Sequence, residues 1–297
     1  MSVTIGIEIG VASALAVAVD AGGLIVGRGE QALTGGGAPM AAGAAATGGA
    51  RAAGAAGVSA GVAAYEPDSA ETADVIHALG AAFRVPAPAA NLGHAAVVAE
   101  AWCGAATGVR DVVSLLVGER VTAGVLLDGR PWLGAHGLAG SAAWLALNPV
   151  ERQDYRQHGC LDAEISARGV ARRLAWRVHA GDLSRVVERA GGLEAVTAQH
   201  VYDGARSGDG VAISVVRDTV RYIAMAVANL SAMVDPEMVV LGGDIAAAQD
   251  LLLEPVRQEC QRRLSPGLFD NLRIVASPLG DAAAAIGAAR LAATAGP

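Results

Sequence analysis

Lysine is absent from this sequence, so all 22 of its basic residues are arginines. A P-loop of the form GxxxxGK[ST] needs a lysine to reach the phosphates, and Schiff-base catalysis needs a lysine amine, so both are excluded. The formal net charge is −7, and there is no basic run of the kind that binds a phosphate backbone. We therefore expect no direct nucleic-acid binding by this chain.

Cysteine is also scarce. Cys103, Cys160 and Cys260 are odd in number, far apart and without CxxC spacing. This pattern predicts neither a disulfide framework nor a complete zinc site. We expect a reducing, cytoplasmic location.

Aromatic residues make up only 3% of the chain and charged residues 17%, whereas 53% of residues are apolar and 39 are glycine. This composition excludes a disordered chain and predicts closely packed backbones in an Ala/Gly-rich interior. The first residues, MSVTIGIEIG, lack a cationic leader, which predicts no signal peptide. The charge-free window 31–50 is rich in Ala and Gly and contains Pro39, so we expect no membrane span.

The first part of the chain has strand patterns followed by helical ones. Residues 3–28 predict a two-stranded hairpin, in which VTIGIEIGVASALAVAV is one strand and LIVGRGE the other. The low-complexity segment 34–57 predicts a weak helix or a loop. A buried strand (GVSAGVAAY) and a helix over about 69–83, capped by Asp68 or Ser69, follow.

The second part repeats this order. AAVVAEAWCGAA predicts a helix, and DVVSLLVGERVTAGVLLDGRPWLG predicts a second hairpin. Residues 160–233 are mostly helical in pattern, and two strand, glycine turn and helix units close the chain. Two hairpin openings, each followed by helices, predict duplicated α/β lobes with a cleft between them.

Five motifs in this order resemble the ROK family of bacterial sugar kinases and sugar-responsive repressors. They are IGIEIG…VD, NLGHAA with EAWCGAA, LLVGERVTAGVLLDGRPWLGAHGLAG, HGCLDA, and VDPEMVVLGGDIA with GDAAAAIGAA. The resemblance covers most of residues 1–30 and 90–290, and it implies a two-lobed actin-like ATPase (ribonuclease H-like) α/β fold. The implied lobes are 1–108, with a closing helix from about 280–297, and 109–279.

The position of the family's catalytic residue is changed. The resemblance implies Asn-Asp before the helix that follows, with the Asp as general base for the attacking sugar hydroxyl, but this chain has Asn91 and Leu92. A hydrocarbon side chain cannot hold a proton, and loss of a general base typically costs about 10² to 10⁴ in rate. His94 is either a substitute base or a capping or packing residue.

The implied phosphate and sugar positions are also altered. On the phosphate side the family's Asp-x-Gly-Gly-Thr and Gly-Thr-Gly turns correspond to Glu8, Gly10, Val11 and Ala12, and to Gly118, Glu119 and Arg120. On the sugar side the implied contacts are Asn91 and Asp162, while Trp144 stands where the family has His and is expected to offer a face for stacking on a sugar ring. His136, in the loop GAHG, is either a ligand contact or an ordinary loop residue.

The family's structural zinc site corresponds to Trp144, Gln153, Tyr155 and Cys160. One possible ligand of four predicts no zinc, with Cys160 a buried thiol. Gly242 and Gly243 lie between a strand and a helix, so they serve either nucleotide binding or close packing. Asp281, after Gly280, has the same alternatives, and we expect it to cap a helix.

Taken together, these changes predict a ROK-like pseudokinase that has lost sugar-kinase activity and acts as a sugar- or nucleotide-binding regulatory protein, with no catalytic residue. A first alternative is an active, glucokinase-like kinase using ATP with Mg²⁺ and a carboxylate such as Glu66, Asp68 or Asp162 as base. The others are a sugar-sensing regulator acting on DNA through a partner, and a scaffolding homo-oligomer. The resemblance implies a homodimer or homotetramer, and we expect no membrane partner.

Overall fold

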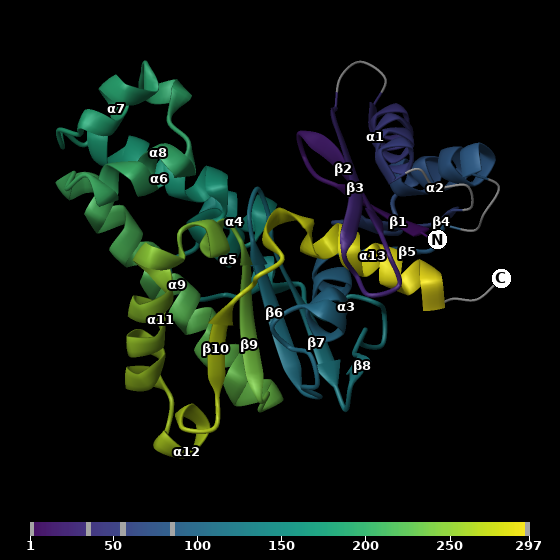
Figure 1. Ribbon diagram of the computed structural model, residues 1–297. Coiled ribbons are helices and arrows are strands. Elements are labelled where there is room, and N and C mark those ends of the chain that lie inside the picture. The colour runs from purple at the N-terminus through teal and green to yellow at the C-terminus, as the bar shows by residue number, and fades with distance from the viewer. Residues whose placement is uncertain (1–2, 34–36, 54–57, 84–86, 295–297) are drawn as a thin grey trace. The chain divides into compact units, whose positions relative to one another are not determined.

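The computed structural model describes residues 3–33, 37–53, 58–83 and 87–294 (Figure 1). Contacts divide the chain into two compact units, and each is described by itself below. The first contains Met1–Ser114, Ala123–Gly140 and Ser277–Pro297, and the second contains Leu115–Thr122 and Ser141–Ala276. This division places Ala123–Gly140 in the first unit, whereas the sequence assigns it to the second lobe; the boundary at 108/109 stays a prediction.

The first sheet has five strands in the order β3-β2-β1-β4-β5. They are β1 (Val3–Ile9), β2 (Ser13–Val19), β3 (Ile25–Ala32), β4 (Val58–Ala64) and β5 (Ala89–Asn91). The strands β1, β2 and β3 are antiparallel neighbours, while β4 runs parallel to β1 and β5 parallel to β4. The carboxyl ends of β1, β4 and β5 therefore meet at one edge, which is where an α/β sheet places its ligands.

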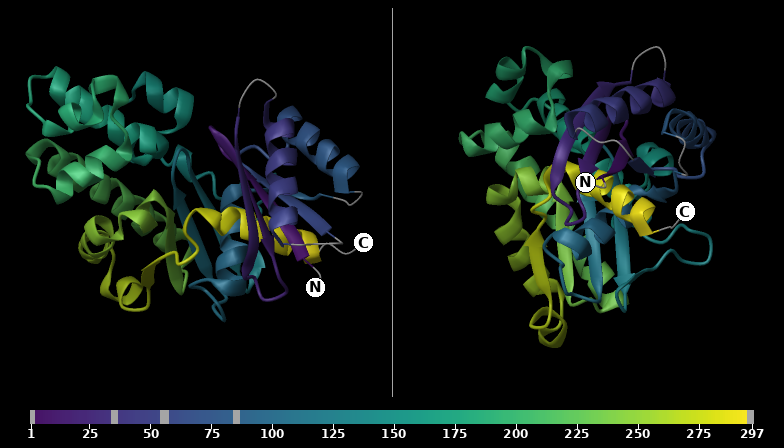
Figure 2. Two further views of the ribbon diagram at one scale, coloured as in Figure 1. Left: turned by 45° about the horizontal axis from the view of Figure 1, so that its top comes forward. Right: turned by 45° about the vertical axis from the view of Figure 1, so that its right-hand side comes forward.

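Helices cover both faces of this sheet (Figure 2). They are α1 (Gly37–Ala53), α2 (Ala70–Phe83), α3 (Leu92–Cys103), α13 (Ala283–Thr294) and the short η3 (Gly280–Ala282). Because side chains alternate along a strand, Ile5 and Ile7 pack with the alanines of α1 on one face. Gly6 faces the other way, where an added Cβ would lie 1.7 Å from the Ala285 carbonyl of α13. The expected close packing of an Ala/Gly-rich interior is confirmed.

The opening 17-residue run is not one strand, as the sequence predicts, but two. Gly10 ends β1, and its N–H donates to the Ser13 carbonyl at 2.9 Å, which closes a turn before β2. The uncertain segment 34–57 forms α1 over its described part, while 34–36 and 54–57 lie outside the described residues. The helix after β4 starts as expected, with the Ser69 Oγ accepting from the Thr72 N–H at 3.2 Å.

The second sheet has the order β10-β9-β6-β7-β8. Its strands are β6 (Val112–Val117), β7 (Val121–Leu127), β8 (Arg130–Pro131), β9 (Met238–Gly243) and β10 (Arg273–Ala276). The strands β9 and β10 are parallel, and β7 and β8 antiparallel. The expected second hairpin is thus present as β6, β7 and β8.

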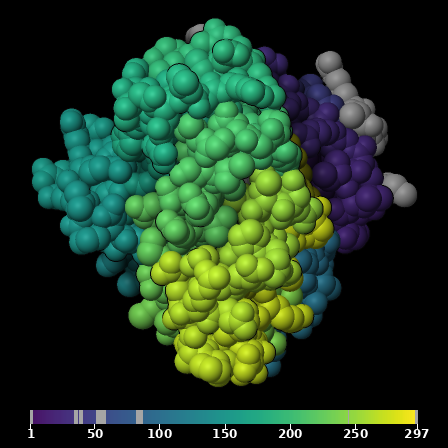
Figure 3. Space-filling view, turned by 90° about the vertical axis from the view of Figure 1, so that its left-hand side faces the viewer, coloured from purple at the N-terminus to yellow at the C-terminus, as the bar shows by residue number. Residues whose placement is uncertain are grey.

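The second unit is mainly helical, as expected for residues 160–233. Its helices are η1 (Ala142–Trp144), α4 (Gln153–His158), α5 (Cys160–Ile165), α6 (Ala167–His179), α7 (Arg185–Ala190), η2 (Leu193–Ala195), α8 (Ala198–Arg206), α9 (Gly210–Val234), α10 (Asp244–Ala247), α11 (Gln249–Arg263) and α12 (Pro266–Phe269). The long helix α9 packs against α6, α8 and α11, and Figure 3 shows the face that carries α9 and α11 in green and yellow-green. No described helix has the length and hydropathy needed to cross a membrane.

Candidate functional site

Asn91 lies where β5 meets α3, and its side chain holds that junction together. Its Oδ1 accepts from the Gly93 N–H at 2.9 Å and so caps α3, while its Nδ2 donates to the Tyr65 carbonyl at 3.0 Å. The second bond ties the start of α3 to the end of β4. Asn91 thus lies at the carboxyl edge of the first sheet. It is the residue that the sequence predicts as a sugar contact.

Leu92 is the first residue of α3, and its side chain packs, half-buried, against an alanine cluster that includes Ala63 and Ala95. Gly93 is needed beside it, because an added Cβ would lie 2.1 Å from the Ala123 carbonyl of β7. His94 is only 3% exposed. Burial lowers its pKa, and backbone groups of Trp132 and Ala139 only partly offset this. The structure therefore supports a packing role for His94.

The phosphate-side residues of the first unit lie near an ion pair that the sequence did not predict. Arg28 of β3 donates two hydrogen bonds to Asp281, at 3.2 and 2.6 Å. The pKa of Asp281 is lowered, chiefly by the hydrogen bond from Arg28. The hydrogen bond to Asp281 raises the pKa of Arg28, and the charge of Glu8 on β1 adds to this effect. Glu8 therefore lies near this ion pair. Gly10 follows at the end of β1.

Asp281 is not the helix cap that the sequence predicts. It lies inside η3, whose N-cap is Leu279, and its carboxylate is used by Arg28. Because Arg28 and Asp281 are 253 positions apart, only the tertiary fold brings them together.

His136 is exposed in the loop after β8. Gly134 and Gly137 flank it with φ values of 76° and 71°, and the Ala139 N–H donates to the Leu133 carbonyl at 3.0 Å to close the loop. This left-handed backbone explains the glycines. A ligand contact by His136 stays a prediction.

In the second unit, several of the predicted residues surround the turn between β6 and β7. Gly118 begins this turn, and its N–H donates to the Arg120 carbonyl at 3.1 Å. On one side of the turn, Gly243 of β9 has φ 72°, and an added Cβ would lie 2.2 Å from the Val117 carbonyl. Close packing therefore requires Gly243. Gly242 is buried next to it, and nucleotide binding at this Gly-Gly pair stays a prediction.

Asp162 of α5 lies on the other side of that turn. It is fully buried, its Oδ1 accepts from the Val121 N–H at 2.8 Å, and the same oxygen is 3.4 Å from the Arg120 Nε. Its Oδ2 has no hydrogen-bond partner among the described residues. Burial raises the pKa of Asp162, an effect that the Val121 N–H and Arg120 partly offset. A buried carboxylate oxygen without a donor is costly unless a ligand or water supplies one.

Trp144, at the end of η1, is 54% exposed, so its ring is available for stacking. It lines a hollow of about 230 Å³ together with Tyr155 and Cys160. Three of the four positions that correspond to the family's zinc ligands thus meet around one hollow, with a single thiol among them. Among the described residues, no group of three or more His, Cys, Asp or Glu side chains is placed to hold a metal ion.

The profile of the ROK family matches residues 54–295. A glucokinase of Thermotoga maritima is 31% identical over 202 residues, which are 68% of this chain and 64% of that protein. A glucokinase of Halalkalibacterium halodurans is 29% identical over 69% of this chain and 62% of its own length. The match thus spans less than two thirds of these relatives.

The fold is that of solved ROK proteins. A ROK family glucokinase from Streptomyces griseus, determined in complex with glucose and AMPPNP, superposes with a TM-score of 0.84 at 24% identity, covering 98% of this chain and 99% of that one. A ROK hexokinase from Thermus thermophilus gives 0.73 at 24% identity, with 97% of each chain covered. The predicted two-lobed actin-like ATPase fold of the ROK type is confirmed.

Proposed function

Because the chain belongs to the ROK family, we propose that it is an ATP-dependent sugar kinase that transfers the γ-phosphoryl group of ATP to a hydroxyl group of a hexose. The observation that carries this proposal is the 31% identity over 202 residues to a glucokinase. The glucose and AMPPNP in the Streptomyces griseus structure supply the ligand classes. The hexose itself is a matter for experiment.

The sequence-based prediction of a chain that has lost kinase activity is wrong. It rests on replaced residues at individual positions, whereas two relatives that match this chain over more than two thirds of its length, at 31% and 29% identity, are glucokinases. Those relatives favour a sugar kinase over a regulatory protein without activity.

Each unit is proposed to offer sugar contacts of its own. In the first unit, Asn91 and the loop residue His136 would hydrogen-bond sugar hydroxyl groups. In the second, Trp144 would stack on the ring and Asp162 would accept a hydroxyl proton through its Oδ2. The buried Oδ2 supports this role, because a sugar hydroxyl would supply the donor that it lacks.

The proposed nucleotide contacts are Glu8, Gly10, Gly118, Gly242 and Gly243. Gly118 supports this role, because no described atom lies within 4 Å of an added Cβ there and a phosphate can approach the backbone closely. Mg²⁺ prefers carboxylate oxygens, and Glu8 offers one close to the end of β1. When bound, the metal ion would neutralise charge on the phosphates.

Phosphoryl transfer can proceed with Leu92 in place of the general base. Phosphoryl transfer passes through a loose transition state, for which positioning and electrostatic stabilisation supply most of the rate. Three carboxylates are candidates for the missing base: Glu66, Asp68 and Asp162. Glu66 is exposed and follows Tyr65, whose carbonyl accepts from Asn91, so this carboxylate is close in sequence to the Asn91 contact.

The test is ADP release by the purified full chain with ATP, Mg²⁺ and a panel of glucose, mannose, fructose and N-acetylmannosamine. We expect sugar-dependent ADP release above a blank without sugar, and a sugar phosphate in equal amount by mass spectrometry. Glu66→Gln, Asp68→Asn and Asp162→Asn then identify a base by a loss in kcat of about 10² or more. If no sugar in the panel gives product above the blank, the proposal is refuted. A homodimer or homotetramer and the cytoplasmic location remain predictions.

A further inference from the structure

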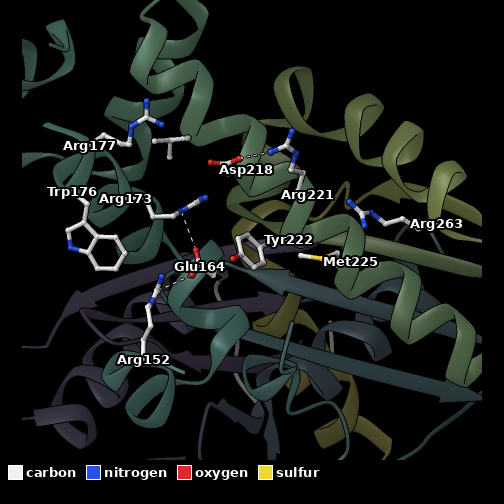
Figure 4. Close-up of a pocket in the computed structure, with 11 residues that line it drawn as sticks. Arg152, Glu164, Arg173, Trp176, Arg177, Asp218, Arg221, Tyr222, Met225 and Arg263 are labelled. Atoms are coloured by element: carbon white, nitrogen blue, oxygen red, sulfur yellow. Dashed lines mark hydrogen bonds and ion pairs between the residues drawn. The ribbon is translucent and has the colours of Figure 1, made fainter. Parts of the chain in front are cut away.

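The second unit contains a pocket of about 490 Å³ whose wall is rich in arginine (Figure 4). Its basic lining residues are Arg152, Arg173, Arg177, Arg221 and Arg263. Glu164 and Asp218 are the acidic residues of the described lining, and Asp154, Asp182 and Glu259 beside it pair with Arg152, Arg177 and Arg263. The described lining includes none of the residues proposed above for sugar or nucleotide. The pocket therefore gathers arginine side chains at a place that the proposed kinase reaction does not use.

The floor of this pocket is a buried charge network around Glu164 of α5. Glu164 is 2% exposed, accepts a hydrogen bond from the Tyr155 hydroxyl, and pairs with Arg152 at 2.9 Å and Arg173 at 3.7 Å. Figure 4 shows both guanidinium groups converging on this carboxylate. Arg152 also shares Asp154 with Arg172, so three arginines face two carboxylates and the floor keeps a surplus of one positive charge.

Arg173 of α6 is 93% buried and incompletely satisfied. One of its terminal nitrogens donates to the Thr219 hydroxyl, while its Nε faces the Glu164 carboxylate at 3.7 Å, beyond hydrogen-bond distance. A buried guanidinium N–H without a hydrogen-bond acceptor is costly, and an anionic oxygen within hydrogen-bond distance would remove that cost. This buried group points to an anionic ligand.

The rim arginines are paired only with exposed carboxylates. Arg177 pairs with Asp182 and Arg221 with Asp218, and the four side chains are between 40% and 54% exposed. Exposed ion pairs contribute little and are screened by salt, so these arginines can turn toward a stronger anion. Guanidinium groups bind phosphate oxygens in a bidentate manner.

The pocket also has an apolar surface. Trp176 of α6 is 43% exposed, and the guanidinium carbons of Arg152 and Arg172 lie 4.8 Å from its ring centre. A tryptophan face flanked by cations can pack against the carbon skeleton of a small molecule. The volume is within the usual range of about 300 to 1,000 Å³ for small-molecule sites.

We propose that this pocket is a second ligand site, which binds a phosphorylated small molecule carrying at least two negative charges. Its phosphate would bind Arg173, Arg177 and Arg221, and its carbon skeleton would lie against Trp176. The proposal does not rest on the kinase reaction, since it needs no turnover.

The test is a calorimetric titration of the full chain with inorganic pyrophosphate and, separately, with glucose 6-phosphate. We expect binding of at least one of these anions, and a Kd at least about tenfold higher after Arg177→Gln combined with Arg221→Gln. Both side chains are half exposed, so the double variant should fold, which circular dichroism verifies. Binding of pyrophosphate alone would show that an inorganic anion is sufficient. Tighter binding of glucose 6-phosphate would show that the site prefers an organic phosphate.

The matched control is Arg217→Gln. Arg217 is an exposed arginine on the same helix α9, but it lines a different hollow. Its loss should leave the Kd unchanged. The proposal is overturned by no binding of either anion up to about 10 mM, by equal weakening in Arg217→Gln, or by no weakening in the double variant. Tryptophan fluorescence gives an independent measure of where the ligand binds. A change on binding that is absent in Trp176→Phe places the ligand beside Trp176.

Discussion

At position 92, where the family resemblance implies the general base of the proposed reaction, this chain has leucine. Leu92 begins α3 next to the capping Asn91, and its hydrocarbon side chain cannot hold a proton. We expect Leu92→Asp to raise kcat for hexose phosphorylation by about 10² to 10⁴, because a carboxylate there can take the proton of the sugar hydroxyl. Steady-state ADP release at saturating sugar and ATP measures this.

The matched variant is Leu92→Asn, which has nearly the same shape as the aspartate but cannot hold a proton at neutral pH. It should not raise kcat. Equal rates in the two variants would show that a residue at position 92 does not act as a base. The activity of a contaminating host kinase would be the same with either substitution.

At the scale of single residues, the structure adds surroundings that the sequence does not show. Asn91 lies at the sheet edge and Trp144 is exposed, while their sugar contacts stay predictions. The full burial of Asp162 and the Arg28–Asp281 pair were not predictable. Both depend on partners from other elements, so no local sequence pattern signals them.

Among the elements, the junction between β9 and α10 makes a strict demand on residue type. Gly243 combines φ 72° with a position where a Cβ would lie 2.2 Å from the Val117 carbonyl. We expect Gly243→Ala to lower the free energy of unfolding by at least about 2 kcal/mol, because the left-handed backbone and the overlap with β6 both oppose the methyl group. Urea unfolding followed by circular dichroism measures the loss.

Gly118→Ala is the control at the neighbouring turn. No described atom lies within 4 Å of an added Cβ there, and its φ is outside the left-handed region. The free energy of unfolding of Gly118→Ala should therefore stay within about 0.5 kcal/mol of that of the parent chain. If Gly243→Ala were equally mild, close packing at this turn would not be what requires the glycine.

Element types were predictable wherever the periodicity was strong, as in α9 and in the two closing strand and helix units. The first strand was predicted too long, because alternating apolar residues continue across the turn at Gly10. The pairing of β1 with β2 decides at which residue this run folds back, and it is visible only in the folded chain. The low-complexity segment forms α1 because the sheet supplies an apolar face for its alanines.

At the scale of the whole chain, Glu100 joins α3 to the segment that precedes α13. It is 1% exposed, accepts a hydrogen bond from the Ser277 hydroxyl, and accepts one from the Ala105 N–H at 2.8 Å. Burial raises the pKa of Glu100, and these two donors only partly offset it. The protonated form is therefore favoured by folding.

The sign of the pH dependence follows from this raised pKa. The stabilisation is complete below the ordinary glutamate pKa of about 4.3 and is lost as the pH rises through the folded-state value. We expect Glu100→Gln, which never ionises, to gain stability relative to the parent chain as the pH rises, by about 1.4 kcal/mol per pH unit between the two pKa values. Thermal unfolding of both proteins from pH 4 to pH 8 measures this.

Glu194→Gln serves as the control, since Glu194 is exposed in η2. Its stability relative to the parent chain should change little over the same range. A pH-independent gap for Glu100→Gln would contradict the assigned role of the buried carboxylate.

The sequence by itself determined the two-part α/β architecture, the family and the order of the motifs, because these follow from the period of apolar residues and the spacing of glycines. It also determined which chemical groups stand at each family position, including Leu92. Only the tertiary structure decided which of these groups are buried, which are paired, and which distant arginines surround the pocket beside Glu164. Burial and pairing are properties of neighbours that lie far apart in the sequence, so they exist only once the chain has folded.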